Sequence, residues 1–271
     1  MKEIDIKECH HILLTIAVAF DEICNRHQIP YYMIGGTMLG AIRHKGFIPW
    51  DDDMDFGVER RYIPTLLHAL EEELPSHLKV RTLENCEHII CNFFKIEDVR
   101  TEVIDKLDDR PTGIGINIDL FPLDNGRNNF FQTMMLTHYI YFLLTLKDYL
   151  FFDHKIRRGF KKWIAFFLRK TNFISIRKRL RYIDRVIFRY AQDKSRYLIN
   201  YNGRWRTKEM VLKRVMGNPK VYPFENIMLT GIEHAHDYLS VLYGNYMQIP
   251  QESKRIYHFT QKQFKNDCNY D

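Results

Sequence analysis

The chain has 271 residues, of which 45% are hydrophobic and 27% are charged, a composition typical of a globular protein and not of a disordered one. The first residues are acidic where a signal peptide would be basic, and we find no run of about 18 uncharged apolar residues, so we expect neither a signal peptide nor a membrane-spanning helix. The net charge of +6 is small, and most of the excess lies between Lys155 and Arg189. With its few, scattered cysteines, the chain is expected to be cytoplasmic.

The first elements follow from hydrophobic spacing and from two glycines. Apolar residues at helical intervals predict a helix from about Ile6 to His27. The β-favouring run Pro30–Ile34 stops at Gly35-Gly36, and Thr37 is expected to cap a helix over Met38–Arg43. The order strand, glycine pair, helix is the local arrangement that lets a phosphate approach the backbone.

The next stretch predicts a mixed α/β pattern. Alternation of polar and apolar residues indicates a strand over Asp53–Val58, and helical spacing returns near Tyr62 to Glu73. Four more segments are typical of strands: Leu78–Leu83, His88–Ile96, Thr101–Ile104 and Ile114–Phe121.

After Pro122 the pattern is mainly helical. Three segments predict helices: Phe130–Phe152, Ile156–Arg169 and Ile174–Tyr190. The tail adds a strand-like piece, Glu225–Thr230, and a helix near His234–Tyr243. We therefore expect an α+β fold, with a mixed-sheet catalytic half over residues 1–125 and a mainly helical half over residues 126–271.

Four carboxylates, Asp51, Asp52, Asp53 and Asp55, lie within five residues, and they repel one another unless cations neutralise them. On a strand, Asp53 and Asp55 point to the same face, so together they can hold a hard cation such as Mg²⁺. A solvated acidic turn is the alternative, but Trp50 before the cluster and the apolar residues after it favour a place beside the core.

A calcium-binding EF-hand loop is a second alternative, because Asp recurs at alternate positions from Asp51. That loop needs glycine at its sixth position and a bidentate glutamate at its twelfth. The chain has Phe56 and Tyr62 at these places, so the calcium reading fails.

A third carboxylate is expected from a neighbouring strand. Asp119 lies between Ile118 and Leu120, and an unpaired carboxylate in such a strand would be costly to bury. A salt bridge to a basic residue is the structural alternative. Asp124, after Pro122, is expected in an Asx turn or cap.

Basic residues near these elements are candidates for phosphate contacts. Arg43 ends the helix after the glycine pair, and Lys95 lies among apolar residues, where an ammonium needs an anionic partner. We expect both to meet a diphosphate, whereas Lys45 is expected in a solvated loop. The chain has no P-loop or dinucleotide-binding glycine motif.

Three segments together resemble the LicD family of phosphocholine transferases, relatives of the fukutin-type ribitol-phosphate transferases. The longest is Ile34–Val58, IGGTMLGAIRHKGFIPWDDDMDFGV, and the second is Ile118–Asp124, IDLFPLD. The third, Leu242–Met247 with Pro250, has Asn245 where the family often has Asp.

The resemblance implies a nucleotidyltransferase fold and the transfer of a phospho-alcohol, typically phosphocholine from CDP-choline, onto a sugar of a cell-surface glycan or its lipid-linked precursor, with release of CMP. It implies that Asp53, Asp55 and Asp119 bind Mg²⁺, or Mn²⁺, for an in-line displacement. One of these three, or Asp52, would accept the proton of the acceptor hydroxyl. Substrate contacts are expected from a further set of residues: Gly35, Gly36, Thr37, Arg43 and Lys95.

Other functions stay open at this point. CDP-ribitol or CDP-glycerol could replace CDP-choline, and ordinary nucleotidyl transfer is the alternative chemistry. A basic adaptor on a membrane surface is the non-enzymatic alternative, but an adaptor has no use for three carboxylates on adjoining strands. We expect no nucleic-acid partner.

The basic middle segments predict attachment to an anionic membrane surface, on its inner face. Ile156–Arg169 and Ile174–Tyr190 combine Trp or Phe with many Lys and Arg, as interfacial helices do. The alternative is that their apolar faces pack on the catalytic half and their charges are only solvated.

Overall fold

The computed structural model describes residues 3–105, 110–127, 129–151, 163–164, 166–167, 170, 174–191, 194–255 and 260–265. The chain divides into two compact units. The first contains residues 1–89, 93–123 and 213–271, and the second contains residues 90–92 and 124–212. Helices and a mixed sheet make up the structure, which confirms the predicted α+β class.

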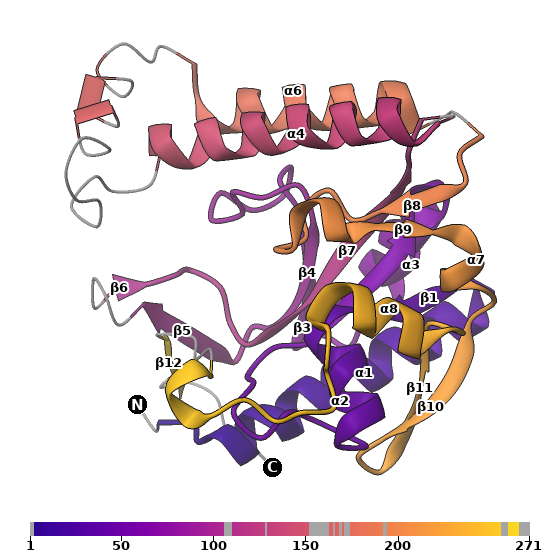
Figure 1. The fold of residues 1–271 in the computed structure, drawn as a ribbon. Helices are drawn as coiled ribbons and strands as arrows, with labels where there is room; N and C mark the ends of the chain where they lie inside the picture. The colour runs from indigo at the N-terminus through magenta and orange to yellow at the C-terminus, as the bar shows by residue number, and fades with distance from the viewer. Residues whose placement is uncertain are drawn as a thin grey trace. The chain divides into compact units, whose positions relative to one another are not determined.

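The main sheet of the first unit has the strand order β10-β11-β1-β2-β7-β4-β3 (Figure 1). It is mixed, because β1 runs parallel to β11 and β2 runs parallel to β7, while the other neighbours are antiparallel. The strands, in sheet order, are β10 (Lys220–Phe224), β11 (Ile227–Gly231), β1 (Tyr31–Met33), β2 (Asp55–Glu59), β7 (Asn117–Asn125), β4 (Phe94–Asp98) and β3 (Leu78–Arg81).

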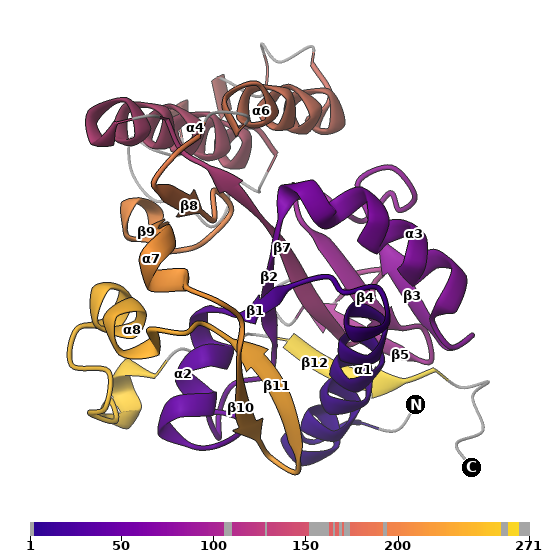
Figure 2. The ribbon, with the colours of Figure 1, turned by 90° about the vertical axis from the view of Figure 1, so that its right-hand side faces the viewer.

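Helices cover this sheet on both sides. Figure 2 shows α1 and α3 on one side and α2 and α8 on the other. The core under α1 is aromatic: the Phe20 ring meets the Tyr31 ring edge-on at 4.9 Å and the Phe56 ring at 5.1 Å. The helices of this unit are α1 (Ile6–Arg26), α2 (Gly35–Arg43), α3 (Ile63–Glu73), α7 (Lys213–Met216) and α8 (Ala235–Tyr243), with 3₁₀ turns at Arg60–Tyr62 and Glu252–Lys254.

A small antiparallel sheet completes the first unit. Its strand order is β12-β5-β6, with β12 at Thr260–Phe264, β5 at Thr101–Asp105 and β6 at Arg110–Pro111. The N-terminal segment joins it, because the Ile4 N–H donates to the Lys262 carbonyl at 2.9 Å. This contact brings β12 beside the start of α1.

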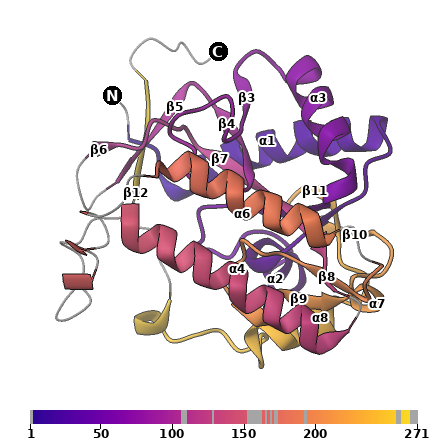
Figure 3. The ribbon, with the colours of Figure 1, turned by 90° about the horizontal axis from the view of Figure 1, so that it is seen from above.

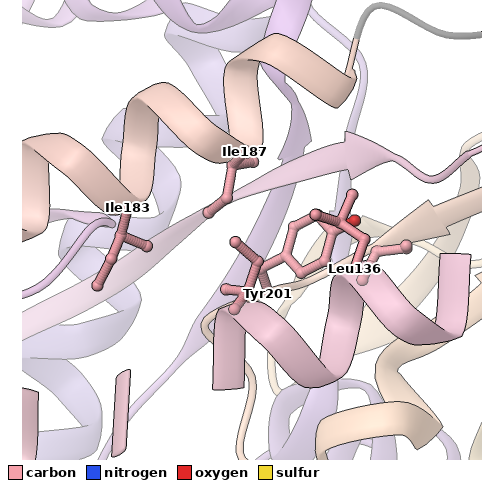
Figure 4. Close-up of a cluster of buried hydrophobic side chains, with 6 residues drawn as sticks. Leu136, Ile183, Ile187 and Tyr201 are labelled. Carbon is pink, nitrogen blue, oxygen red and sulfur yellow. The ribbon is translucent and has the colours of Figure 1, made fainter. Parts of the chain in front are cut away.

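The second unit is built on two helices that lie side by side, α4 (Phe130–Phe151) and α6 (Ile176–Ala191) (Figure 3). The other elements are β8 (Tyr197–Ile199), β9 (Met210–Leu212) and the 3₁₀ turn Arg206–Glu209. The two helices enclose buried side chains with the segment around β8 (Figure 4): Leu136, Ile140, Ile183, Ile187, Ile199 and Tyr201.

Most predicted helices are confirmed, including the long ones at α1, α4 and α6. The predicted helix Ile156–Arg169 lies almost entirely outside the described residues. The predicted halves, 1–125 and 126–271, follow the change in composition, whereas the contacts place residues 213–271 in the first unit. The reason is strand pairing, because β11 comes late in the chain but hydrogen-bonds to β1.

Two strand predictions are wrong in their limits. The strand expected over His88–Ile96 begins only at Phe94, because the chain before it turns into the second unit, where the Asn92 amide donates to the Leu180 carbonyl at 2.8 Å. The strand expected to stop at Phe121 continues to Asn125. The turn expected at Pro122 is therefore absent, since the fixed φ of proline suits an extended backbone.

Asp124 is not in the expected Asx turn. It is 1% exposed and pairs with Ile199 of β8 in an antiparallel ladder.

Among the helices that the structure describes, none combines the length and hydrophobicity that crossing a bilayer requires.

Candidate active site

Three neighbouring strands place Asp55, Asp119 and Lys95 in one row. Asp55 of β2 is the register partner of Asp119 of β7 in the parallel ladder. Asp119 is in turn the register partner of Lys95 of β4 in the antiparallel ladder. Since neighbouring strands are about 4.8 Å apart, the two carboxylates and the ammonium occupy adjacent positions on the sheet.

Lys95 is held by polar groups of β7. Its ammonium donates to the Asn117 Oδ1 at 3.0 Å and forms an ion pair with Asp119. The Lys95 and Asp119 side chains are only 19% and 17% exposed, so each charge depends on the other for compensation. Lys95 was expected to have an anionic partner, and a salt bridge was the structural alternative for Asp119. The ion pair between these two residues accounts for both.

Asp55 is a buried carboxylate surrounded by other carboxylates. Burial raises its pKa well above the ordinary value, and the neighbouring carboxylates Asp53, Asp119 and Asp51 raise it further. The Lys95 ammonium acts in the opposite direction. A cation between these carboxylates would relieve this repulsion.

The glycine pair begins α2 directly beside the acidic cluster. Gly35 has a φ of +53°, and a Cβ at this position would lie 3.2 Å from the Asp55 Oδ2. A Cβ on Gly36 would lie 2.8 Å from the Asp51 Oδ2. The positive end of α2 therefore faces two carboxylates, and the missing side chains leave the room for that approach.

Thr37 does not cap the helix as predicted. The helix begins at Gly35, three residues before the predicted start at Met38, with Ile34 as an N-cap that makes no side-chain hydrogen bond. The Thr37 hydroxyl instead accepts a hydrogen bond from the Asp55 N–H at 2.7 Å. This bond fixes the first residue of β2 against α2.

The loop that carries Asp51, Asp52 and Asp53 comes before β2, which begins only at Asp55. The strand predicted over Asp53–Val58 is therefore wrong in its limits, because the pairing of β2 with β7 begins at Asp55 and leaves Asp53 in the loop. Asp53 is nevertheless near enough to raise the pKa of the Asp55 carboxyl.

Two residues that sequence reasoning missed hold this loop. Lys262 of β12 forms an ion pair with Asp52, and both side chains are less than 15% exposed. The His10 Nε2 is 2.7 Å from the Asp51 carbonyl oxygen, and the His10 ring stacks on Phe47 at 3.9 Å. Neither contact has a local sequence signal, because His10 and Lys262 are far from the loop along the chain.

Arg43 lies at the other end of α2 from the glycine pair, which over nine residues is roughly 12 Å. Its guanidinium donates to the Tyr246 carbonyl at 2.8 Å and to the His44 Nε2 at 2.9 Å. The bond to Tyr246 joins α2 to the segment after α8, and the bond to His44 stays at the end of α2. The contact of Arg43 with a diphosphate stays a prediction.

The oxygen donors fit a hard divalent ion. Mg²⁺ is usually held by one or two carboxylates, with water and substrate phosphates completing its shell. Asp55 and Asp119 are such a pair, with Asp53 close by. Within the described part of the chain, no group of three His, Cys, Asp or Glu side chains is already arranged to enclose an ion.

The mixed sheet, the glycine pair that opens α2 and the paired aspartates on parallel strands define a nucleotidyltransferase-type enzyme. Comparison with known families agrees: residues 28–179 match the family model "LicD/FKTN/FKRP, nucleotidyltransferase domain". The chain belongs to this family. The predicted family and the predicted enzyme class, a transferase of phosphorus-containing groups, are confirmed.

Curated relatives show the same likeness. The chain is 25% identical over 283 residues to the lipopolysaccharide cholinephosphotransferase LicD of Haemophilus influenzae, covering 97% of this chain and 99% of the relative. It is 49% identical over 37 residues to an uncharacterized protein of Rickettsia prowazekii, which is 14% of each chain. A Rickettsia typhi protein, also uncharacterized, matches over the same length.

Proposed function

We propose that this chain transfers phosphocholine from CDP-choline onto a sugar hydroxyl of a cell-surface glycan, or of its lipid-linked precursor, and releases CMP. The observation that carries the proposal is the register that pairs Asp55 with Asp119 beside the start of α2. The choice of phosphocholine is supported by the full-length likeness to a lipopolysaccharide cholinephosphotransferase.

In the proposed step, the oxygen of the acceptor hydroxyl forms a bond to the distal phosphorus of the donor. The bond from that phosphorus to the bridging oxygen breaks, and CMP leaves with the electron pair. The proton of the hydroxyl passes to a carboxylate of the site: Asp52, Asp53, Asp55 or Asp119. Two of these carboxylates are held by an ion pair, Asp52 by Lys262 and Asp119 by Lys95.

The proposed cofactor is Mg²⁺, with Mn²⁺ as the alternative, held by Asp53, Asp55 and Asp119. It would offset the charge that develops on the phosphate oxygens. Lys95 lies against Asp119, and this position supports the proposal that its ammonium contacts the diphosphate of the donor. The start of α2, at Gly35 and Gly36, would add its positive end to the same anion.

The test is release of CMP from a panel of donors. The purified chain is incubated with Mg²⁺ and CDP-choline, CDP-ribitol or CDP-glycerol, with and without lipopolysaccharide or teichoic-acid acceptors. We expect CMP release to be greatest with CDP-choline and to depend on the acceptor. Release of pyrophosphate from CTP or ATP, without CMP release from any CDP-alcohol, would favour ordinary nucleotidyl transfer and overturn the proposal.

Three substitutions test the carboxylates. Asp53→Asn, Asp55→Asn and Asp119→Asn remove charge with little change in volume, and each should abolish transfer. Glu71→Gln, at an exposed position of α3, is the matched control and should leave CMP release unchanged. Near-normal turnover of any one aspartate variant at saturating Mg²⁺ would remove that residue from the proposed metal site.

We also propose that the enzyme works at the inner face of the membrane, where a lipid-linked acceptor would be available. The support is the basic composition between Lys155 and Arg189, together with the exposure of Trp163, Phe166 and Phe167. Cell fractionation tests this position: we expect the chain in the membrane fraction at low salt and its release at high salt. Recovery only in the soluble fraction at low salt would contradict it.

A further inference from the structure

The second unit contains a groove between α4 and α6 that the proposed reaction does not use. Its cavity volume is about 640 Å³, and all of its lining residues belong to these two helices or to the segment just before α4. Three of them are arginines, Arg127, Arg185 and Arg189, and none carries a carboxylate. A concave surface of this kind favours an anionic ligand.

Contacts at the two ends of the groove show how the helices run. At one end the Arg127 guanidinium lies over the Tyr190 ring at 4.9 Å. At the other end the hydroxyls of Tyr139 and Tyr182 are 3.2 Å apart. The start of α4 is therefore beside the end of α6, and the helices are antiparallel (Figure 3).

The arginines lie on one side of the groove. Arg127 and Arg189 lie at the end marked by Tyr190, and Arg185, one helical turn before Arg189 on the same face of α6, lies between Tyr190 and Tyr182. Guanidinium groups bind phosphate through paired N–H bonds, so neighbouring Arg185 and Arg189 are suited to one phosphate.

Most of the other side chains in the groove are apolar or aromatic, with Gln132 as the one polar amide in the lining. Met135 and Leu136 line the α4 side, and Val186 lines the α6 side between Arg185 and Arg189. Leu136 also reaches the buried cluster below the groove, so the floor is continuous with the core of this unit (Figure 4).

An exposed apolar stripe extends the groove along α4. Phe131, Met135, Tyr139 and Phe142 follow one another at intervals of four, four and three residues, which places them on one helix face. Phe131, Met135 and Phe142 are 64%, 54% and 61% exposed. The stripe covers roughly 16 Å of helix, and surface of this kind marks a binding site more often than a solvated face.

Arginines on α6 and before α4, beside an exposed apolar stripe of α4, match an amphiphile with an anionic head. We infer that the α4–α6 groove binds a phosphate-headed lipid of the membrane, with the phosphate at Arg127, Arg185 and Arg189 and the hydrocarbon chain along Met135, Tyr139 and Phe142. A nucleic acid repeats its charge along its length and would leave the apolar stripe unused. This inference does not depend on the transfer reaction.

The experiment is flotation of the full-length chain with vesicles, without donor or metal. Vesicles of phosphatidylcholine alone are compared with vesicles that contain phosphatidic acid. We expect binding to the anionic vesicles at low salt and little binding to the neutral ones. Equal binding to both kinds of vesicle would contradict the proposed role of the arginines. Failure to bind either kind would contradict the proposal that the groove binds lipid.

Two pairs of substitutions distinguish binding through the groove from binding through the general positive charge of the protein. Arg185→Gln combined with Arg189→Gln removes two exposed charges from the groove, and Lys213→Gln combined with Lys220→Gln removes two exposed charges from the first unit. We expect the arginine pair to weaken binding by about 30-fold, because each basic residue near an anionic surface contributes about fivefold. The lysine pair should weaken binding by no more than about twofold.

Two further measurements address folding and ligand class. Met135→Gln, at a position that is 54% exposed, should weaken vesicle binding without changing the circular dichroism melt. Inorganic phosphate, added while the total ionic strength is held constant, should not displace the chain from vesicles. An unaltered affinity of the arginine pair, displacement by inorganic phosphate, or stronger binding to an oligonucleotide than to anionic vesicles would each overturn the inference.

Discussion

Replacement of Asp55 by Asn should make the metal-free protein more stable and at the same time inactive. The Asp55 carboxylate is buried among like charges, and its pKa is raised well above the ordinary value by burial and then by Asp53, Asp119 and Asp51. Asparagine keeps the shape of the side chain and removes the charge. The substitution therefore relieves repulsion that the folded protein otherwise carries.

The magnitude can be worked from the strand register. Asp55 and Asp119 are direct partners on neighbouring parallel strands, so their charges are about 5 Å apart. At an effective dielectric of about 20, this repulsion amounts to roughly 3 kcal/mol. The Lys95 ammonium offsets part of it, so we expect a gain of about 1–2 kcal/mol in the free energy of unfolding, or roughly 2–4 °C in Tm.

Thermal melts with and without Mg²⁺ check this reasoning. Wild-type protein should gain up to about 2.7 kcal/mol at a Mg²⁺ concentration 100 times the Kd, and the Asp55→Asn variant should lose most of that response. Glu71→Gln is again the charge-matched control and should melt like wild type in both conditions. An Asp55→Asn variant that melts at a lower temperature than wild type without metal would refute the electrostatic argument.

Three further predictions concern other positions. Lys95→Met should slow CMP release by about one to three orders of magnitude, because it removes a charge-assisted contact in a sheltered site, and unchanged rates would leave Lys95 with only its salt bridge. Glu209 is buried and its pKa is raised from 4.5 to about 7, so its contribution to stability is complete below pH 4.5 and is lost as the pH rises through about 7. Glu209→Gln should remove up to roughly 3 kcal/mol of pH-dependent stability between these values, and equal pH slopes for variant and wild type in denaturant titrations would contradict this. Gly40→Ala should cost about 1–3 kcal/mol, because its Cβ would clash with the Gly46 carbonyl, and an unchanged Tm would contradict that packing.

Local sequence was sufficient for the parts of this protein that depend on neighbouring residues. Apolar residues at helical spacing predicted α1, α4 and α6, and alternation predicted a strand over Asp53–Val58, where the structure has β2 at Asp55–Glu59. The glycine pair and the clustered aspartates predicted a site that binds a phosphate and a metal ion. Periodicity and backbone freedom act over a few residues, so they can be read from the sequence directly.

Positions decided by long-range pairing could not be found in this way. Thr37 was expected to cap a helix, but it bonds to the Asp55 N–H, because α2 begins earlier and packs against the start of β2. Asp124 was expected in a turn, but β7 continues past Pro122 and buries it. In both places a tertiary contact replaced the local one.

The sequence by itself pointed to the family and the α+β class, and it supplied Asp53, Asp55 and Asp119 as candidate metal ligands. Only the tertiary structure decided that Asp119 lies between Asp55 and Lys95, and that Lys262 holds Asp52 from a strand 210 residues away in the chain. The tertiary structure also decided the antiparallel pairing of α4 with α6, which forms the arginine-lined groove. Residue types are a property of the chain, whereas strand register and helix packing are set by which apolar faces can be buried together, and that choice involves the whole chain.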